Sequence, residues 1–282
     1  MRIGFLSDLH CERWRTDLVG LLAGVAERRE LDYLVLSGDI AAGADAALRF
    51  CERLDAAMTT RLRIVAGNHD LYVPDYKNLT PAQIRAESAA FYARITYESA
   101  YSLLLHPIIT PQWFITGLGG WYDYSFARGY PDVDVERLSR SRVARWLWSD
   151  NAQVRGGCFD YRIDKARVEE DIRTLRAALT CSEASGRRTC VVTHMLPTRA
   201  LAARLPIPYY SHFVHLLGSE RYRALYEEMG VSLSISGHTH LPTRRCISGV
   251  RYVNVSIPSR ALWRHPFAPE KEIERVMLVL NG

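Results

Sequence analysis

Five stretches of this sequence place small polar side chains directly after a short apolar run. In chain order these stretches end in Ser7-Asp8-Leu9-His10, Ser37-Gly38-Asp39, Gly67-Asn68-His69-Asp70, Thr193-His194 and Gly237-His238-Thr239-His240. Short apolar runs of this kind are typical of buried strands. Open α/β sheets build their sites on the loops at the carboxyl ends of strands. The sequence therefore predicts one site to which five strand ends contribute.

The rest of the chain predicts how these strands are connected. Up to residue 66 the apolar pattern alternates between strand and helix, which is typical of parallel strands joined by crossover helices. We expect strands at residues 2–6, 32–36, 62–66, 101–105, 113–116, 189–192, 232–236, 244–247, 251–255 and 275–280. We expect helices at residues 15–29, 46–57, 81–97, 134–149, 163–179 and 220–228. Residues 71–187 loosen the early pattern, so we interpret them as a cap-like elaboration of a single domain spanning residues 1–282.

The composition is that of a globular protein able to bury a large core, with 48% hydrophobic and 24% charged residues in a chain of 282. No apolar run is long enough to cross a bilayer, and no signal-like segment precedes the strand that begins at Arg2. The six cysteines are scattered without a C-x-x-C pair, which is typical of idle thiols in a reducing compartment. We therefore expect a cytoplasmic protein with no membrane partner.

A cluster of basic residues in the middle of the chain has two interpretations. The chain carries a formal charge of +5, and most of its positive residues are arginine, which suits phosphate contacts. The cluster precedes Trp146 and Trp148 and consists of Arg137, Arg140, Arg142 and Arg145. Basic residues beside aromatic ones can bind nucleic acid. We favour the other interpretation, a solvated helix face whose tryptophans pack inward.

The polar groups at the five strand ends are carboxylates, imidazoles and one amide, without a thiolate. Such ligands suit Mn²⁺, Fe or Zn²⁺ rather than a structural zinc site of cysteines. The ordered set, from Asp8-x-His10 to Gly237-His238-x-His240, resembles that of the calcineurin-like metallophosphoesterase superfamily. The resemblance implies an α/β fold of four layers, in which two packed, mixed β-sheets are flanked by helices. It also implies two divalent metal ions above the strand ends, for which we favour Mn²⁺ over Fe, Zn or Ni.

The resemblance assigns seven residues to the two metal ions, as one triad for each ion and a carboxylate that bridges both. The first ion would be held by Asp8, His10 and His240. The second ion would be held by Asn68, His194 and His238, and Asp39 would bridge both ions. A carboxylate can bridge in this way because its two oxygens offer about four lone-pair positions.

The resemblance makes His69 the catalytic residue. It implies that His69 and Asn68 face the substrate and that His69 acts as a general acid or as an electrostatic stabiliser. We interpret Asp70 as a structural residue of the loop. In the protein Ser/Thr phosphatase branch, an Asp three residues after the Gly-Asp motif orients the catalytic histidine, but here that position holds Ala42. The chain is therefore closer to the bacterial phosphodiesterase-type members, and the partner of His69 is not identified.

The expected activity is hydrolysis of a small phosphoester, such as a nucleotide. A hydroxide bridging the two metal ions would attack phosphorus in line, while both ions absorb the charge that develops on the phosphoryl oxygens. We expect a phosphodiesterase, with a phosphomonoesterase or a nuclease of the same superfamily as the alternative. A non-catalytic scaffold is disfavoured because every ligand position is filled, and a nucleic-acid partner is not favoured. The substrate, the native metals and the oligomeric state stay open.

Three further features have no assigned role. Residues 209–215 (Tyr-Tyr-Ser-His-Phe-Val-His) lie between two ligand segments, and we favour an aromatic lid or plain packing over a third metal site at His212 and His215. Tyr72 could stack on the substrate or anchor its own loop. Asn254-Val255-Ser256 lies where, by the resemblance, a closing loop returns to the site, but the sequence gives it no clear role.

Overall fold

The strands of this protein are short, and most coincide with an apolar run of the sequence. The computed structural model describes residues 1–127, 142–143, 146–158, 160–183, 186–202 and 213–282. The strands are β1 (Arg2–Leu6), β2 (Tyr33–Ser37), β3 (Arg61–Val65), β4 (Ile108–Ile109), β5 (Trp113–Gly117), β6 (Arg142–Val143), β7 (Trp146–Leu147), β8 (Arg188–Val192), β9 (Leu233–Ser236), β10 (Thr243–Ile247), β11 (Val250–Asn254) and β12 (Leu278–Asn281). The α-helices are α1 (Leu18–Arg28), α2 (Ala44–Ala56), α3 (Pro81–Ala93), α5 (Ser149–Gln153), α6 (Tyr161–Glu183), α8 (Glu220–Glu228) and α9 (Pro269–Val276).

The strands form two mixed sheets and one small pair. In the first sheet the order is β12-β1-β2-β3, and only β12 runs antiparallel to its neighbour. In the second sheet the order is β10-β11-β9-β8-β5-β4. The two edge strands, β10 and β4, run antiparallel to their neighbours β11 and β5. The pair β6-β7 stands apart. Because most strands in both sheets are parallel, their carboxyl ends lie at the same edge of each sheet.

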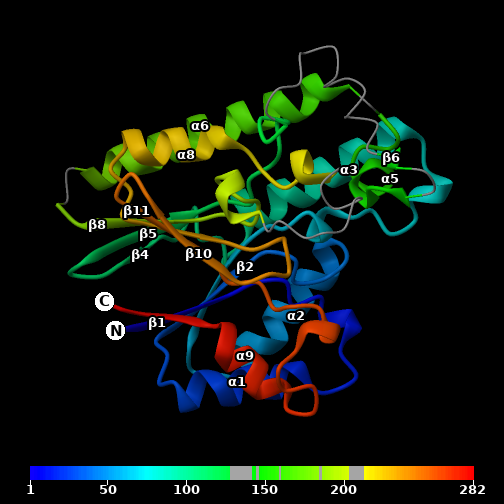
Figure 1. The fold of residues 1–282 in the computed structure, drawn as a ribbon. Coiled ribbons are helices and arrows are strands. Elements are labelled where there is room, and N and C mark those ends of the chain that lie inside the picture. Colours follow the sequence, from blue (N-terminus) through cyan, green and yellow to red (C-terminus); the bar gives the residue numbers. More distant parts are fainter. Residues whose placement is uncertain (128–141, 144–145, 159, 184–185, 203–212) are drawn as a thin grey trace.

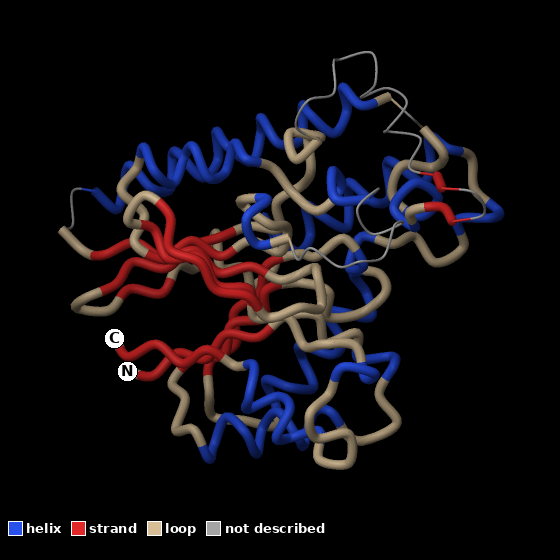
Figure 2. The backbone as a smooth tube through the Cα atoms, viewed as in Figure 1, coloured by secondary structure: helices blue, strands red, loops and turns tan. Residues whose placement is uncertain are grey.

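The helices cover the outer faces of the two sheets. Figure 1 shows α1, α2 and α9 beside the first sheet and α6 and α8 beside the second, with the two chain ends next to each other. In Figure 2 the two layers of strands lie between these helices. The order is therefore helix layer, sheet, sheet, helix layer, and the predicted fold is confirmed.

Alternating side chains explain why a central strand such as β2 is buried on both faces. In β2, Leu34 and Leu36 belong to the apolar cluster that includes α1 and α2, whereas Tyr33 and Val35 belong to the cluster between the sheets. This alternation follows from the two-residue period of a strand. In α2 the buried residues recur at helical spacing, at Ala47, Phe50, Cys51 and Leu54, so one helix face packs on the sheet.

Three secondary-structure predictions differ from the structure. Residues 101–105 form turns with a single bridge between Ile64 and Ser102, because the Ser102 hydroxyl donates to the Thr96 carbonyl and favours a turn. Of the predicted strand 275–280, the first two residues end α9, whose buried Ile273 and Val276 follow helical spacing. The helix predicted at 134–149 is wrong where the structure describes it, since β6 and β7 pair there. Residues 128–141 and 144–145 lie outside the described part.

The segment 71–187 contributes to more than one part of the molecule. Its strands β4 and β5 belong to the second sheet, and α6 packs on that sheet. Figure 1 shows α3, α5 and β6 gathered beyond the carboxyl ends of the strands. The boundaries of the cap-like elaboration and of the single domain remain a prediction. Across the described ranges, no helix combines the length and apolar character needed to cross a bilayer.

Candidate metal centre

The five polar strand ends meet at one place. Asp8 and His10 follow β1, Asp39 follows β2, Asn68 and His69 follow β3, His194 follows β8, and His238 and His240 follow β9. Six of the seven predicted ligands are at most 8% exposed, and only His240 is half-buried. The loops that carry them are brought together because β1, β2 and β3 are neighbours in one sheet and β8 and β9 are neighbours in the other.

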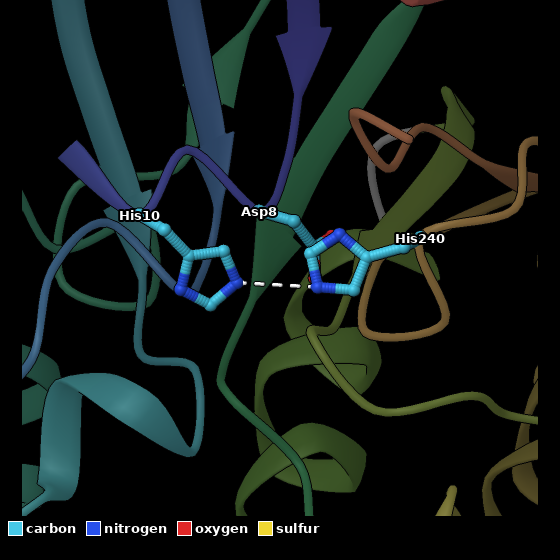
Figure 3. A group of neighbouring side chains, drawn as sticks. All are labelled: Asp8, His10 and His240. Atoms are coloured by element: carbon cyan, nitrogen blue, oxygen red, sulfur yellow. Dashed lines mark hydrogen bonds and ion pairs between the residues drawn. The ribbon is translucent and has the colours of Figure 1, made fainter. Parts of the chain in front are cut away.

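The first cluster contains Asp8, His10 and His240, whose candidate ligand atoms all lie within 4.8 Å of one another. Figure 3 shows the two imidazole rings facing each other beside the carboxylate, with 3.2 Å between the Nε2 atoms. The His240 Nε2 atom is also 3.7 Å from Asp8 Oδ1. On the other side of its ring, His240 Nδ1 donates to the Ile257 carbonyl at 3.0 Å. That bond leaves the Nε2 lone pair directed into the cluster.

The second cluster contains Asp39, His194 and His238, again with ligand atoms within 4.8 Å of one another. His194 Nδ1 donates to the Ser37 carbonyl at 2.8 Å, so its Nε2 faces inward. This Nε2 lies 3.1 Å from Asn68 Oδ1 and 3.4 Å from Asp39 Oδ1. The structure therefore brings the amide oxygen of Asn68 to the same point as the other three residues.

Asp39, a member of the second cluster, also reaches a residue of the first cluster. Its Oδ1 atom is near His194, while its Oδ2 atom is 3.6 Å from His10 Nε2 and 4.0 Å from His69 Nε2. Oδ1 also accepts the backbone N–H of His69 at 2.8 Å. This is the position that the predicted bridging role requires.

The donor atoms fit a pair of cations. His238 Nε2 is buried without a hydrogen-bond partner among the described residues. In His194 and His240 the Nδ1 atom donates a hydrogen bond to a backbone carbonyl, which is the usual arrangement of metal-ligating histidines. Four imidazoles and two carboxylates converge with their acceptor atoms facing one another, an arrangement that a positive ion would stabilise. The residues could therefore hold two divalent metal ions.

The ionisation of the histidines agrees with this fit. Burial lowers the pKa of His10 to about 3. Burial, followed by the charge of His194, lowers the pKa of His238 to about 3 as well. Burial also disfavours the charged form of His194, but the charge and hydrogen bond of Asp39 outweigh burial and raise its pKa to about 9. At neutral pH, His10 and His238 are therefore ready to bind a metal ion, whereas His194 must first lose a proton.

Comparison with known proteins identifies the family. The profile described as calcineurin-like phosphoesterase matches residues 1–242, most of the chain. The chain belongs to the calcineurin-like phosphoesterase family. It is therefore a metal-dependent phosphoesterase, a hydrolase, as predicted. A search of curated proteins by sequence gives no significant match.

Solved structures share the fold of this phosphoesterase. One is the phosphopantetheinyl hydrolase PptH from Mycobacterium tuberculosis, with 19% sequence identity and a TM-score of 0.70, covering 99% of this chain and 95% of that chain. Another is a dimetal phosphatase from Danio rerio, with 17% identity and a TM-score of 0.53, covering 90% of this chain and 86% of that chain. At these identities the similarity establishes the fold alone.

The backbone of the phosphoesterase site is unusual at the predicted ligands. Eight described residues other than glycine have positive φ, and five of them are predicted metal ligands: Asp8, His10, Asp39, His238 and His240, with φ between 43° and 76°. This left-handed conformation is disfavoured for residues with a side chain. It occurs where the surrounding structure imposes it, often at functional sites. The loops are therefore held in a conformation that the local sequence alone would not choose.

Two residues outside the ligand set hold the loops in place. Asp70 accepts the backbone N–H groups of Ile40, Ala41 and Gly67 at 2.7–3.0 Å, so it ties the loop after β2 to the loop after β3. Asn254 donates to the Gly237 carbonyl and accepts from Ser256 N, which supports the loop after β9. The contacts of Asp70 are those of a structural loop residue, which is how we interpret it from the sequence. Asn254 also has a structural role.

The sequence analysis missed two residues beside the clusters. Asp150 in α5 is fully buried and accepts from Asn68 Nδ2 at 2.8 Å. The ring centroid of Trp148 lies 5.8 Å from that of His238 and 5.4 Å from that of Phe213. The sequence predicts Trp148 on a helix face, but in the structure it is extended and directly precedes α5. No local spacing could have identified either residue, since both come from a segment far from the ligands in sequence.

Some predicted features lie elsewhere or outside the described residues. His215 is buried, with its ring stacked on Tyr124 at 5.8 Å, so it packs in the interior. Residues 203–212, including His212, are not among the described residues, so the aromatic lid stays a prediction. Arg137, Arg140 and Arg145 also lie outside the described residues, so the interpretation of the basic cluster stays a prediction.

Proposed function

We propose that this protein is a phosphodiesterase that acts on a small diester at the two clusters, with the seven predicted residues as ligands of two metal ions. The observation that carries the proposal is the convergence of these ligands beside His69, whose imidazole is 22% exposed and lies 4.0 Å from Asp39. When bound, the two ions would supply positive charge that polarises the phosphoryl group and lowers the pKa of water. Mn²⁺ is the favoured ion, and Fe, Zn or Ni are alternatives.

The residues of the chain have distinct tasks in this proposal. The buried clusters hold the phosphoryl group in a fixed position next to His69. His69 reaches the open side of the site, where it would donate a proton to the leaving oxygen. Asn68 and His69 would contact the substrate.

The charge of the site favours a diester over a monoester. A phosphomonoester carries a charge close to −2 at neutral pH, because its second pKa is about 6, whereas a diester carries −1. In the described part of the chain, no lysine or arginine forms a hydrogen bond or ion pair with the predicted ligands or His69. The position of the orienting Asp of protein Ser/Thr phosphatases is Ala42, which also argues against that branch.

A more specific candidate substrate contains a phosphopantetheinyl group. The structure that covers nearly all of this chain, over the segment 71–187 as well, is named a phosphopantetheinyl hydrolase. In a phosphopantetheinyl group the phosphate already carries one ester, so its release from a second oxygen is the cleavage of a diester. A synthetic phosphopantetheinyl alkyl diester tests this candidate directly. The nuclease alternative depends on Arg137–Arg145 and has no supporting contact among the described residues. The cytoplasmic location also stays a prediction.

The test uses purified protein loaded with Mn²⁺ and compares bis(p-nitrophenyl) phosphate with p-nitrophenyl phosphate. We expect faster turnover of the diester. The variant Asp39→Ala should lose activity on both, and His69→Ala should lower kcat by about 10²- to 10⁴-fold. The control is His106→Ala, at an exposed histidine away from the clusters. Faster turnover of the monoester would reverse the assignment, and equal activity in His69→Ala would remove His69 from the mechanism.

A further inference from the structure

The carboxylate of Asp150 accepts three hydrogen bonds at the edge of the second cluster. Oδ1 accepts from Asn68 Nδ2 at 2.8 Å and from the Tyr72 hydroxyl at 3.0 Å, and Oδ2 accepts from Trp148 Nε1 at 2.8 Å. We propose that Asp150 and Tyr72 are positioning residues, which turn the Asn68 amide oxygen toward the second metal ion and hold the ring of His69. This inference rests on the proposed function, in which Asn68 is a ligand and His69 is catalytic.

The first step concerns the two ends of the Asn68 amide. An ionised carboxylate can only accept hydrogen bonds, so the amide group that faces Asp150 must be the NH₂. The oxygen of Asn68 then points the other way, to within 3.1 Å of His194 Nε2. Asp150 is the carboxylate that fixes the NH₂ end of Asn68; without it, the amide could turn its NH₂ toward the cluster, where it could not bind a cation.

The second step concerns the proton on His69. The Tyr72 hydroxyl has one hydrogen, which it donates to Asp150 Oδ1. At 3.3 Å from His69 Nε2, the same hydroxyl oxygen can therefore only accept, which requires the proton on Nε2. Burial, followed by the charge of Asp150, raises the pKa of Tyr72 well above its ordinary value, so the hydroxyl keeps its hydrogen.

The third step concerns the orientation of the His69 ring. The ring contacts Tyr72, with centroids 4.2 Å apart, and His10, with centroids 4.6 Å apart in an edge-on arrangement. Two ring contacts and a hydrogen bond at Nε2 leave the ring little freedom to rotate. Holding a catalytic group in one geometry is itself a source of rate enhancement.

The fourth step concerns where this support comes from. Asp150 is separated from Asn68 by 82 residues, and α5 is attached to the loop of Tyr72 by the bond from Val73 N to the Gln153 carbonyl. The residue that could orient His69 from the loop after β2 is Ala42, which has no polar side chain. The loop after β2 therefore has no polar side chain at this position to orient His69. In this chain, Asp150 and Tyr72, which come later in the sequence, orient it instead.

The experiment measures metal binding and the state of His69 in two variants. In Asp150→Asn, we expect the affinity for the second metal ion to fall about 10- to 100-fold, with the first ion retained. Calorimetry with Mn²⁺ measures this without any turnover. In Tyr72→Phe, we expect two ions to bind normally. In zinc-loaded protein, the ¹⁵N spectrum should show His69 protonated at Nε2 in the wild type and a mixture of tautomers in Tyr72→Phe.

A kinetic arm separates positioning from a general loss of structure. If His69 is misplaced in Tyr72→Phe, turnover of a phenyl diester, with a poor leaving group, should fall about 10- to 100-fold. Turnover of the p-nitrophenyl diester should fall much less. The matched controls are Tyr76→Phe and Asp75→Asn, at residues of the same segment whose side chains form no hydrogen bond to any described residue.

Each outcome supports or overturns the inference. Unchanged affinity for both ions in Asp150→Asn would refute the role of Asp150, and an unchanged His69 tautomer in Tyr72→Phe would refute the role of Tyr72. Wild-type protein that binds two ions but cleaves no diester would contradict the proposed function alone. In that case the binding and tautomer measurements would still decide this inference.

Discussion

Replacing Gly67 by alanine tests whether the close approach of two loops builds the site. A Cβ atom at this position would lie 2.1 Å from Asp39 N and 2.2 Å from Asp39 Oδ1, whereas ordinary van der Waals contact begins at 3.4 Å. Gly67 does not have a positive φ, so an alanine could adopt its backbone conformation. The obstacle is therefore the close contact with Asp39 rather than the backbone conformation.

The cost follows from what must move. To clear the new methyl group, the loops after β2 and β3 must separate by more than 1 Å. This movement would lengthen the bond from His69 N to Asp39 Oδ1 at 2.8 Å and strain the bond from Gly67 N to Asp70 Oδ2 at 2.7 Å. A hydrogen bond to a charged group contributes about 1.5–3 kcal/mol, and overpacking costs about 1–3 kcal/mol. We expect a loss of about 3 kcal/mol or more, which lowers Tm by about 6 °C or more.

The assay records thermal unfolding and metal content together. Gly67→Ala should lose binding of both ions, because Asp39 faces both clusters. The control is Gly24→Ala within α1, where the new Cβ would meet only the flexible end of Arg28 at 3.3 Å. That variant should be more stable by about 0.5–1 kcal/mol, because glycine weakens a helix. A Gly67→Ala protein with wild-type Tm and two bound ions would refute the reasoning.

Two further predictions concern the metal ions. An ion present at 100 times its Kd contributes about 2.7 kcal/mol of stability. Removing the ions with a chelator should therefore lower Tm by about 5 °C for each such ion. An unchanged Tm would contradict ligation by the buried clusters. At pH 7.5, binding of the second ion should release about one proton, because the pKa of His194 is about 9 while that of His10 and of His238 is about 3. Since that proton competes with the ion, affinity should rise about tenfold for each pH unit up to about 9. Calorimetry in two buffers of different ionisation enthalpy measures the protons released, and release of none would count against His194 as a ligand.

Much of the fold could be predicted from the sequence because its signals are local. The alternation of strand and helix up to residue 66 identified β1, α1, β2, α2 and β3 to within a few residues. The predictions failed where a helical pattern hid a local hairpin, as in β6 and β7, and where a serine favoured a turn, as at Ser102. Helical spacing alone cannot reveal that two adjacent segments pair as strands, because strand formation depends on the surrounding packing.

The sequence by itself determined which side chains stand at the five strand ends, because a strand that ends in a polar loop is visible in a few consecutive residues. Only the tertiary structure decided the left-handed backbone of five predicted ligands and the partner of Asn68, Asp150, which lies 82 residues away. The physical reason is that strained loops and buried carboxylates are stable only inside the packing that surrounds them, and contacts between distant segments leave no periodic trace in the sequence.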